Sequence, residues 1–301
     1  MSNSRLVLGL AGAAVLWGGT FVAGRVLAAE VPPVAAAFVR FALAGAALAA
    51  LARREGAGLP RDRRTLGLLV LLGMTGVAGY NLLFFTGLRT VEAGRAALII
   101  ANNPVAIAAG AALVLREPLG WRAGVGIAVA VTGAAVIVTR GEPWAVLSGG
   151  MGWGELCIVG CVVCWTAYTL IGRVALRGVT PLQASAGACV AGALILAGPA
   201  LAAGVIPSLP HWSARAWLAA GYLAFGGTVL AFVWYYRGVQ AFGAARAGVF
   251  INLVPVSGVF FGWLLLGERL DPSVWAGAAL VGAGIALTRR APAPPPRTGS
   301  F

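Results

Sequence analysis

Ten runs of almost uninterrupted apolar residues, most of them about twenty residues long, follow one another along this chain of 301 residues. A run of about twenty residues is long enough to cross a hydrocarbon core of about 30 Å as a helix, at a rise of about 1.5 Å per residue. The strands of a membrane barrel would be shorter, about ten residues, and would alternate in polarity. The sequence therefore predicts an all-α integral membrane protein with ten transmembrane helices. The runs are 6–27, 33–52, 65–88, 94–115, 121–139, 151–172, 181–203, 214–237, 246–266 and 274–288.

Composition agrees with a membrane protein and excludes an ordinary soluble domain. Hydrophobic residues make up 60% of the chain and charged residues only 10%, whereas soluble domains have about 25% charged residues. The 44 glycines suit helices that approach one another closely inside lipid.

The net charge of +13 comes from 22 basic residues, all of them arginine. If the runs cross the membrane in turn, 15 arginines lie on the side of the N-terminus, six lie on the other side, and Arg40 lies within a run. Positive charge is retained on the cytoplasmic side, so we expect both termini in the cytoplasm of a bacterial cell inner (plasma) membrane. This distribution explains the charge without a nucleic-acid partner. The first run is expected to be a retained helix, and the Pro-rich segment 291–301 a disordered cytoplasmic tail.

The first half of the sequence returns in the second half. Because each copy would contain five helices, an odd number, the second copy must enter the membrane from the opposite side. We therefore expect two inverted repeats, 1–148 and 149–290, around a central cavity, an arrangement that lets many transporters alternate access. A shift of 148 aligns Gly12, Trp17, Gly24, Arg25 and Pro33 with Gly160, Trp165, Gly172, Arg173 and Pro181, and a shift of 151 aligns Gly76, Arg95, Pro104 and Glu117 with Gly227, Arg246, Pro255 and Glu268.

Several motifs add a resemblance to this pattern. WGGTF, VRFALAG, AGRAALIIANNPV and LREPLG, with the later echoes AARAGVFINLVPV and LLGERL, are similar to motifs of the drug/metabolite transporter superfamily, EamA family. Within it, the chain resembles bacterial amino-acid exporters, including the YddG-type aromatic amino-acid exporters. The resemblance covers residues from about 5 to 290. It implies ten helices, a substrate cavity between the halves and export of small metabolites.

Aromatic side chains near the middle of the runs are the first candidates for substrate contact. Trp17 and Trp165 lie too deep for the belt of tryptophans at the headgroups, and an indole offers a flat face and one N–H donor. Packing between the repeats is the other explanation. Together with polar neighbours these rings predict an apolar, aromatic-rich small-molecule site. The candidate substrate-binding residues are Trp17, Thr20, Phe21, Tyr80, Asn81, Phe84, Asn102, Asn103, Trp165, Tyr168, Thr228, Phe232 and Asn252.

Two prolines and the asparagines before them predict irregular backbone at membrane depth. Pro104 and Pro255 each remove a backbone donor and bend the helix, which is tolerated where the backbone lines a cavity or is buried in protein. The amides of Asn102 and Asn103 can both donate and accept, and so suit the two charged groups of an amino acid. Hydrogen bonding between helices is the alternative.

Arg40 and Glu155 are the ionisable residues at depth, where each costs about 2.5 to 3.5 kcal/mol on insertion scales. Their depths, about 10 Å and about 6 Å from the outer side, predict an intramembrane ion pair, unless each side chain snorkels to the interface. No carboxylate falls near the midplane, which favours a facilitator or exchanger over proton coupling. Glu117 and Glu268 are expected to pair with loop arginines or to cap helix ends, and their symmetry also suggests gates.

Other functions fit less well. A membrane-embedded enzyme would need a nucleophile and a base, but the one histidine, His211, is in an expected loop, and no GxSxG or HExxH is present. No metal-ligand spacing occurs, and no cofactor is implied. A passive scaffold would leave the inverted duplication without a purpose. Export of nucleotide sugars or cationic toxicants stays open as the alternative, and the chain is expected to act as a monomer on a small-molecule substrate within the lipid bilayer.

Overall fold

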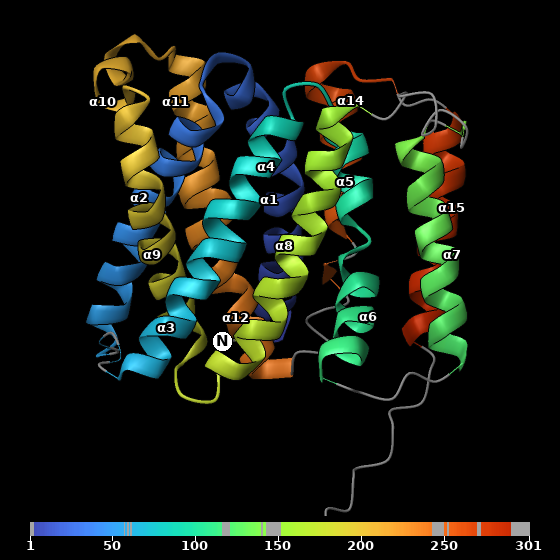
Figure 1. The fold of residues 1–301 in the computed structure, drawn as a ribbon, viewed down its shortest axis with the longest axis horizontal. Coiled ribbons are helices and arrows are strands. Elements are labelled where there is room, and N and C mark those ends of the chain that lie inside the picture. The colour runs from blue at the N-terminus through green and yellow to red at the C-terminus, as the bar shows by residue number, and fades with distance from the viewer. Residues whose placement is uncertain are drawn as a thin grey trace, which may run out of the picture.

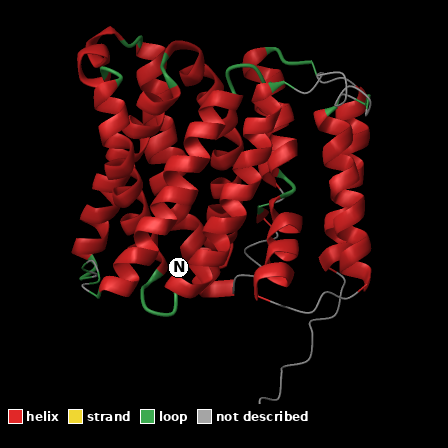
Figure 2. Cartoon of the chain, in the orientation of Figure 1, coloured by secondary structure: helices red, strands yellow, loops and turns green. Residues whose placement is uncertain are grey.

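The computed structural model describes residues 3–56, 58, 60, 62–115, 121–139, 141–142, 152–242, 250–251, 253–269 and 272–289. All regular elements in these ranges are helical, and none of the described residues is in a strand (Figure 2). The predicted tail 291–301, Glu117 and Asn252 lie outside the described residues.

The first half begins with two long helices joined by a tight turn. Proline supplies the first residue of the second helix, where a missing N–H costs nothing. Further along, Asp62 accepts a hydrogen bond from the N–H of Thr65 at 2.8 Å and caps the next helix. The elements are α1 (Asn3–Glu30), α2 (Pro33–Arg54), α3 (Arg63–Leu72), η1 (Gly73–Gly79), α4 (Tyr80–Gly87), α5 (Ala93–Ile100), α6 (Asn103–Leu115) and α7 (Trp121–Val138).

The second half follows a similar sequence of long and interrupted helices. Thr180 and Gln183 form a reciprocal capping box at the start of its second long helix. The elements are α8 (Trp153–Ala175), α9 (Pro181–Ala202), α10 (Val205–Ser208), η3 (Leu209–His211), α11 (Ala214–Gly221), η4 (Tyr222–Leu230), α12 (Ala231–Phe242), α14 (Leu253–Leu266) and α15 (Pro272–Arg289).

Length and hydropathy identify seven stretches of the described chain as candidate membrane spans. Two shorter apolar helices, Gly124–Ile137 and Leu253–Leu266, accompany them. The protein is thus an all-helical, multi-pass membrane protein. The seven spans are Ser4–Glu30, Pro33–Arg54, Arg63–Gly87, Ala93–Val114, Trp153–Ala175, Pro181–Ala202 and Ala214–Tyr235.

Two of these spans contain a π-helical segment that the sequence does not reveal. We expect single helices over 65–88 and 214–237, but η1 interrupts the first and η4 the second. A π-helix shifts the backbone hydrogen bonds by one residue and leaves carbonyl groups that other donors can use. The two segments occupy related positions in the halves, because a shift of 151 places Gly76 of η1 on Gly227 of η4.

The helices pack in contacts that recur when the halves are exchanged. Helix α1 packs on α14 and α12, while α8 packs on α6 and α4. Helix α2 packs on α9, and α7 on α15, the pair that stands at one edge of the bundle (Figure 1). Glycines permit the closest approaches: a Cβ added to Gly133 of α7 would lie 2.7 Å from the carbonyl oxygen of Gly277 in α15.

Candidate functional site

Five aromatic side chains from α1, α4 and α8 form one continuous row, called the aromatic row below. The ring centroids of Phe21 and Phe84 are 5.5 Å apart, and those of Phe84 and Tyr80 are 5.8 Å apart. Tyr80 is 5.6 Å from Trp165, which stacks on Tyr168 at 5.1 Å. The structure therefore brings together five of the predicted substrate-binding residues, contributed by both halves of the chain.

Trp17 belongs to a different group of rings, between α1 and α12. Its ring lies 5.8 Å from Phe232 and 5.2 Å from Tyr235. Its indole N–H donates to the carbonyl oxygen of Gly227 at 3.0 Å, so the donor is already used inside the protein. Thr20 in turn donates its hydroxyl to the carbonyl oxygen of Trp17. The two tryptophans that the repeat aligns thus lie in different surroundings, since Trp165 donates to no acceptor among the described residues.

Arg40 is a buried cation whose hydrogen-bond partners come from both halves of the chain. It lies on α2 and is only 8% exposed. Its Nη1 donates to Oδ1 of Asn81 at 3.0 Å, and its Nε and Nη2 lie 3.4 and 3.3 Å from Oγ1 of Thr228. Its Cζ also lies 5.0 Å from the ring centroid of Phe41, within the range of a cation–π contact.

The two partners of Arg40 are fixed by the π-helical segments. Asn81 donates its amide N–H groups to the carbonyl oxygen of Val77, at 2.9 Å, and to that of Gly76. The hydroxyl of Thr228 donates to the carbonyl oxygen of Leu223 at 2.9 Å. Each side chain therefore donates its hydrogens to carbonyl groups of a π-helical segment, Asn81 to η1 just before it and Thr228 within η4, which leaves its oxygen to accept from the guanidinium.

The predicted interruption at Pro104 is present. Helix α5 ends at Ile100 and α6 begins at Asn103, so the proline lies in the first turn after a break. Nδ2 of Asn102 donates to the carbonyl oxygen of Ile99 at 3.1 Å, whereas Oδ1 of Asn102 and Oδ1 of Asn103 are buried without a hydrogen-bond partner. The break therefore carries two buried amide oxygens that accept no hydrogen bond in this structure.

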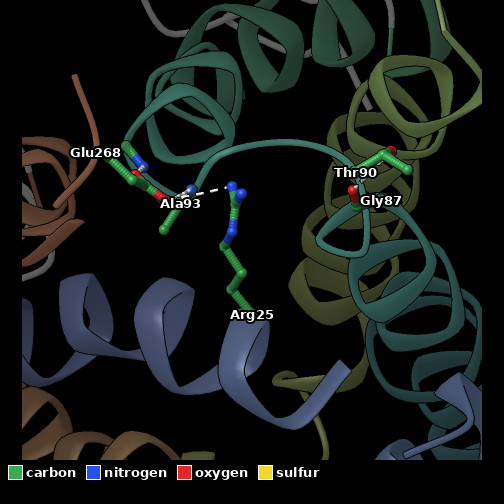
Figure 3. A network of polar contacts seen from close by, with 6 residues as sticks. Arg25, Gly87, Thr90, Ala93 and Glu268 are labelled. Atoms are coloured by element: carbon green, nitrogen blue, oxygen red, sulfur yellow. Dashed lines mark hydrogen bonds and ion pairs between the residues drawn. The ribbon is translucent and has the colours of Figure 1, made fainter. Parts of the chain in front are cut away.

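A cluster of charged groups lies where α5 begins, at the opposite end of α1 from the N-terminus. Glu268, which follows α14, accepts the backbone N–H groups of Ala93 at 2.7 Å and Gly94 at 3.0 Å. Figure 3 shows its carboxylate at the start of α5, facing Arg25. Nη1 of Arg25 is 3.2 Å from Oε1 of Glu268, an ion pair without the alignment of a hydrogen bond. The prediction that Glu268 caps a helix end is confirmed, whereas its arginine partner lies in helix α1 and not in a loop.

Glu155 has a different partner from the one expected from the sequence. Its Oε1 lies 3.6 Å from Nη2 of Arg95 in the first turn of α5. The structure does not bring Arg40 and Glu155 together, because Glu155 is in the first turn of α8, beside α5, while Arg40 is held between α4 and η4. Similar depth along the two helices gave no information on which helices are neighbours. We call Arg25, Ala93, Gly94, Arg95, Glu155 and Glu268 the α5-end cluster.

Sequence reasoning missed the roles of Arg25 and Arg95, although a signal existed. Both are expected on the same side of the membrane as Glu155 and Glu268, so charge complementarity could have paired them. Among the described residues, no three His, Cys, Asp or Glu side chains gather closely enough to hold a metal ion. A cavity of about 220 Å³ lies elsewhere, between the first turns of α1 and α12, and its lining includes Arg5, Trp234 and Arg237.

Comparison with known proteins accords with this architecture. The sequence profile of the EamA-like transporter family matches twice, over residues 4–139 and 152–290. The chain is 30% identical to an uncharacterized transporter, YyaM, of Bacillus subtilis, over 85% of this chain and 84% of that protein. It is also 30% identical to a "probable terminal-alkyne amino-acid exporter" of Streptantibioticus cattleyicolor, covering 96% and 95% of the two chains.

Two further similarities concern the membrane and the fold. An uncharacterized inner membrane transporter of Escherichia coli, YedA, is 28% identical over 91% of this chain and 87% of its own length. A protein of known crystal structure matches with a TM-score of 0.63, at 24% identity, over 95% of this chain and 96% of the other. At that identity the likeness shows the fold alone.

Proposed function

Because the chain belongs to the EamA-like transporter family, we propose that it exports small amphipathic metabolites, most readily amino acids, including aromatic ones. The observation that carries this proposal is the aromatic row, to which both matched halves contribute rings. The relative described as a probable exporter of a terminal-alkyne amino acid supports the same class of cargo.

The transport cycle would use two inverted repeats of five transmembrane helices each. The family profile matches both halves, and the helix contacts recur when the halves are exchanged. The π-helical segments add support, since η1 and η4 occupy related positions. Two such repeats can rock about a site between them and open it to one side at a time.

The α5-end cluster would close one end of the path in this conformation. It joins α1 and α5 of the first half to α8 and Glu268 of the second half through ion pairs and backbone hydrogen bonds. With both termini in the cytoplasm, this end faces away from the cytoplasm. Opening it would separate the cluster, so Arg25 and Glu268 would act as part of a gate.

The substrate would lie between the aromatic row and the break at Asn102. Rings suit the apolar part of an amino acid, and Trp165 has an indole N–H that no described group accepts. The two unpaired amide oxygens of Asn102 and Asn103 suit an ammonium group, which can only donate.

Flux into proteoliposomes tests the proposal. Purified protein would be reconstituted and given a panel of labelled amino acids, with and without a pH gradient. We expect saturable uptake of phenylalanine or a related amino acid down its own gradient, without a requirement for the pH gradient. Absence of flux with every amino acid, together with flux of a cationic toxicant or a nucleotide sugar, would favour the alternative cargo.

Labelling of single cysteines tests the inverted arrangement. One cysteine would be placed within residues 116–122 and another within residues 267–273, in a background where Cys157, Cys161, Cys164 and Cys189 are replaced. We expect a membrane-impermeant maleimide to label the two sites from opposite faces. Labelling of both from one face would disprove the inverted repeats.

A further inference from the structure

Arg40 is a charged group held in place by neutral partners. The guanidinium offers five N–H donors, and the structure gives it two oxygen atoms, Oδ1 of Asn81 and Oγ1 of Thr228. Both partners are almost completely buried, with exposures of 2% and 0%. Surplus donors on a buried cation leave room for a further acceptor.

Among the described residues, no carboxylate pairs with the charge of Arg40. No carboxylate in the described part of the chain lies within 4.0 Å of it; the two ion pairs there belong to Glu268 and Glu155, in the α5-end cluster. Buried charges are normally paired, because burial removes the solvation of the ion. An intramembrane ionisable residue without a counter-ion therefore marks a functional site.

The surroundings of Arg40 are built to fix its position. The amide hydrogens of Asn81 and the hydroxyl hydrogen of Thr228 are used on carbonyl groups of the π-helical segments, so both oxygens must face the guanidinium. One partner comes from each half of the chain. Arg40 thus stands where the two halves meet, with its orientation set before any ligand arrives, which is the arrangement that makes an ion-binding group effective.

The position of Arg40 also relates it to the aromatic row. Its partner Asn81 directly follows Tyr80, whose ring contacts both Phe84 and Trp165. On α4, the residue that binds the Arg40 guanidinium is therefore the direct neighbour of a ring of the aromatic row. This combination suits a molecule that carries an anionic group next to an apolar or aromatic body.

We infer that Arg40 is the counter-ion for an anionic group of the transported molecule, the carboxylate in the case of an amino acid. This inference rests on the proposed function and deepens it, because it states which part of the cargo is obligatory. A zwitterion or an organic anion satisfies the surplus N–H donors, whereas an amine without a carboxylate adds a second positive charge to a buried site. Cationic compounds without an anionic group are therefore excluded as good substrates.

Substrate analogues test the inference without altering the protein. Wild-type proteoliposomes would be given labelled phenylalanine, phenylalaninamide and phenethylamine, which share the ring and the amine but differ at the carboxyl group. We expect saturable flux with phenylalanine, and a rise of about tenfold or more in KM for the other two, as the loss of a hydrogen bond between charged groups predicts. Equal flux of phenethylamine and phenylalanine would overturn the inference.

Variants of Arg40 provide the second arm. Arg40→Gln should raise the KM for phenylalanine by about tenfold or more, and Arg40→Lys, which keeps the charge but loses the planar fork, should recover part of the loss. Arg89→Gln is the matched control, because Arg89 is an exposed arginine that donates to the carbonyl oxygen of Ala28. An unchanged KM in folded Arg40→Gln would refute the inference.

A binding measurement separates this inference from the proposed function. Heat unfolding of detergent-solubilised protein would be followed with 3-phenylpropionate, which has the ring and the carboxylate but no ammonium. We expect 3-phenylpropionate to raise the unfolding midpoint of the wild type and of Arg89→Gln, but not that of Arg40→Gln. If the protein carries no amino acid, the proposed function fails, but the change in unfolding midpoint with 3-phenylpropionate still tests the role of Arg40. If 3-phenylpropionate does not raise the midpoint of the wild type, Arg40 is not part of an anion-binding site.

Discussion

Replacement of Glu268 by glutamine tests whether one carboxylate holds the two halves together at the start of α5. The carboxylate accepts two backbone N–H groups, at 2.7 and 3.0 Å, and its side chain is only 5% exposed. Glutamine has nearly the same shape but one acceptor oxygen, so one of the two N–H groups loses its partner and the other loses the charge assistance.

The magnitude follows from these contacts. A hydrogen bond to a charged group contributes about 1.5 to 3 kcal/mol, and a buried N–H left without an acceptor costs about 1 to 3 kcal/mol. The ion pair with Arg25 adds little, about 0 to 1 kcal/mol, because the Arg25 side chain is 31% exposed. Since these terms overlap, we expect Glu268→Gln to lower the free energy of unfolding by about 2 to 4 kcal/mol.

Reversible unfolding in mixed SDS micelles measures this difference, and amide hydrogen exchange localises it to Ala93 and Gly94. Glu55→Gln is the matched control, because Glu55 is exposed after the end of α2. Gly262→Ala provides an independent route, since an added Cβ would lie 2.5 Å from Oε2 of Glu268 and displace the carboxylate. If Glu268→Gln unfolds like Glu55→Gln and the two amides keep their protection, the cap does not hold the halves together.

Three further outcomes are expected. Gly133→Ala should destabilise the protein by about 1 to 3 kcal/mol, because the added Cβ would lie 2.7 Å from a backbone oxygen of α15. Gly124→Ala on the same helix is the control, since the space around Gly124 is open. Equal free energies of unfolding for the two variants in SDS micelles would contradict the close packing. The backbone N–H of Thr65 donates to Asp62 and lowers the pKa of Asp62 below its ordinary value of 3.8. The cap therefore stabilises the folded protein fully above pH 3.8, and this stabilisation is lost as the pH falls through the lower pKa that Asp62 has in the folded protein. The unfolding midpoint of an Asp62→Ala variant should differ from that of the wild type at neutral pH and converge with it in acid. Trp17→Phe should lower stability by about 0.5 to 1.5 kcal/mol through loss of its internal hydrogen bond, while Trp165→Phe should raise the KM for an aromatic amino acid with little loss of stability; the opposite pattern in flux and unfolding assays would exchange their roles.

The sequence predicts the class of the protein well because long apolar runs have few alternatives. The length of the apolar runs alone predicts a helical membrane protein, and Pro104 alone predicts the break between α5 and α6. The ten-helix count and the inversion stay predictions. The π-helical segments were not predictable, since η1 depends on a side chain, Asn81, that supplies donors to the loosened carbonyl groups.

The candidate site was predictable in its residue types and not in its pairings. Aromatic and amide residues at membrane depth selected Tyr80 and Trp165, whose rings lie 5.6 Å apart in the structure; their contact with a substrate stays a prediction. Depth along a helix could not say that Arg40 faces Asn81 and not Glu155, because that depends on which helices are adjacent. The two aligned tryptophans show the same limit: one sequence motif occurs in two different environments.

The cap on α5 also has a consequence for the order of assembly. Ala93 leaves the ribosome 175 residues before Glu268, the residue that accepts its N–H. Until that late segment is synthesised and inserted, the first turn of α5 must rely on water at the membrane surface for its hydrogen bonds. The N-terminal half is therefore unfinished when its own translation ends, and the second half completes it.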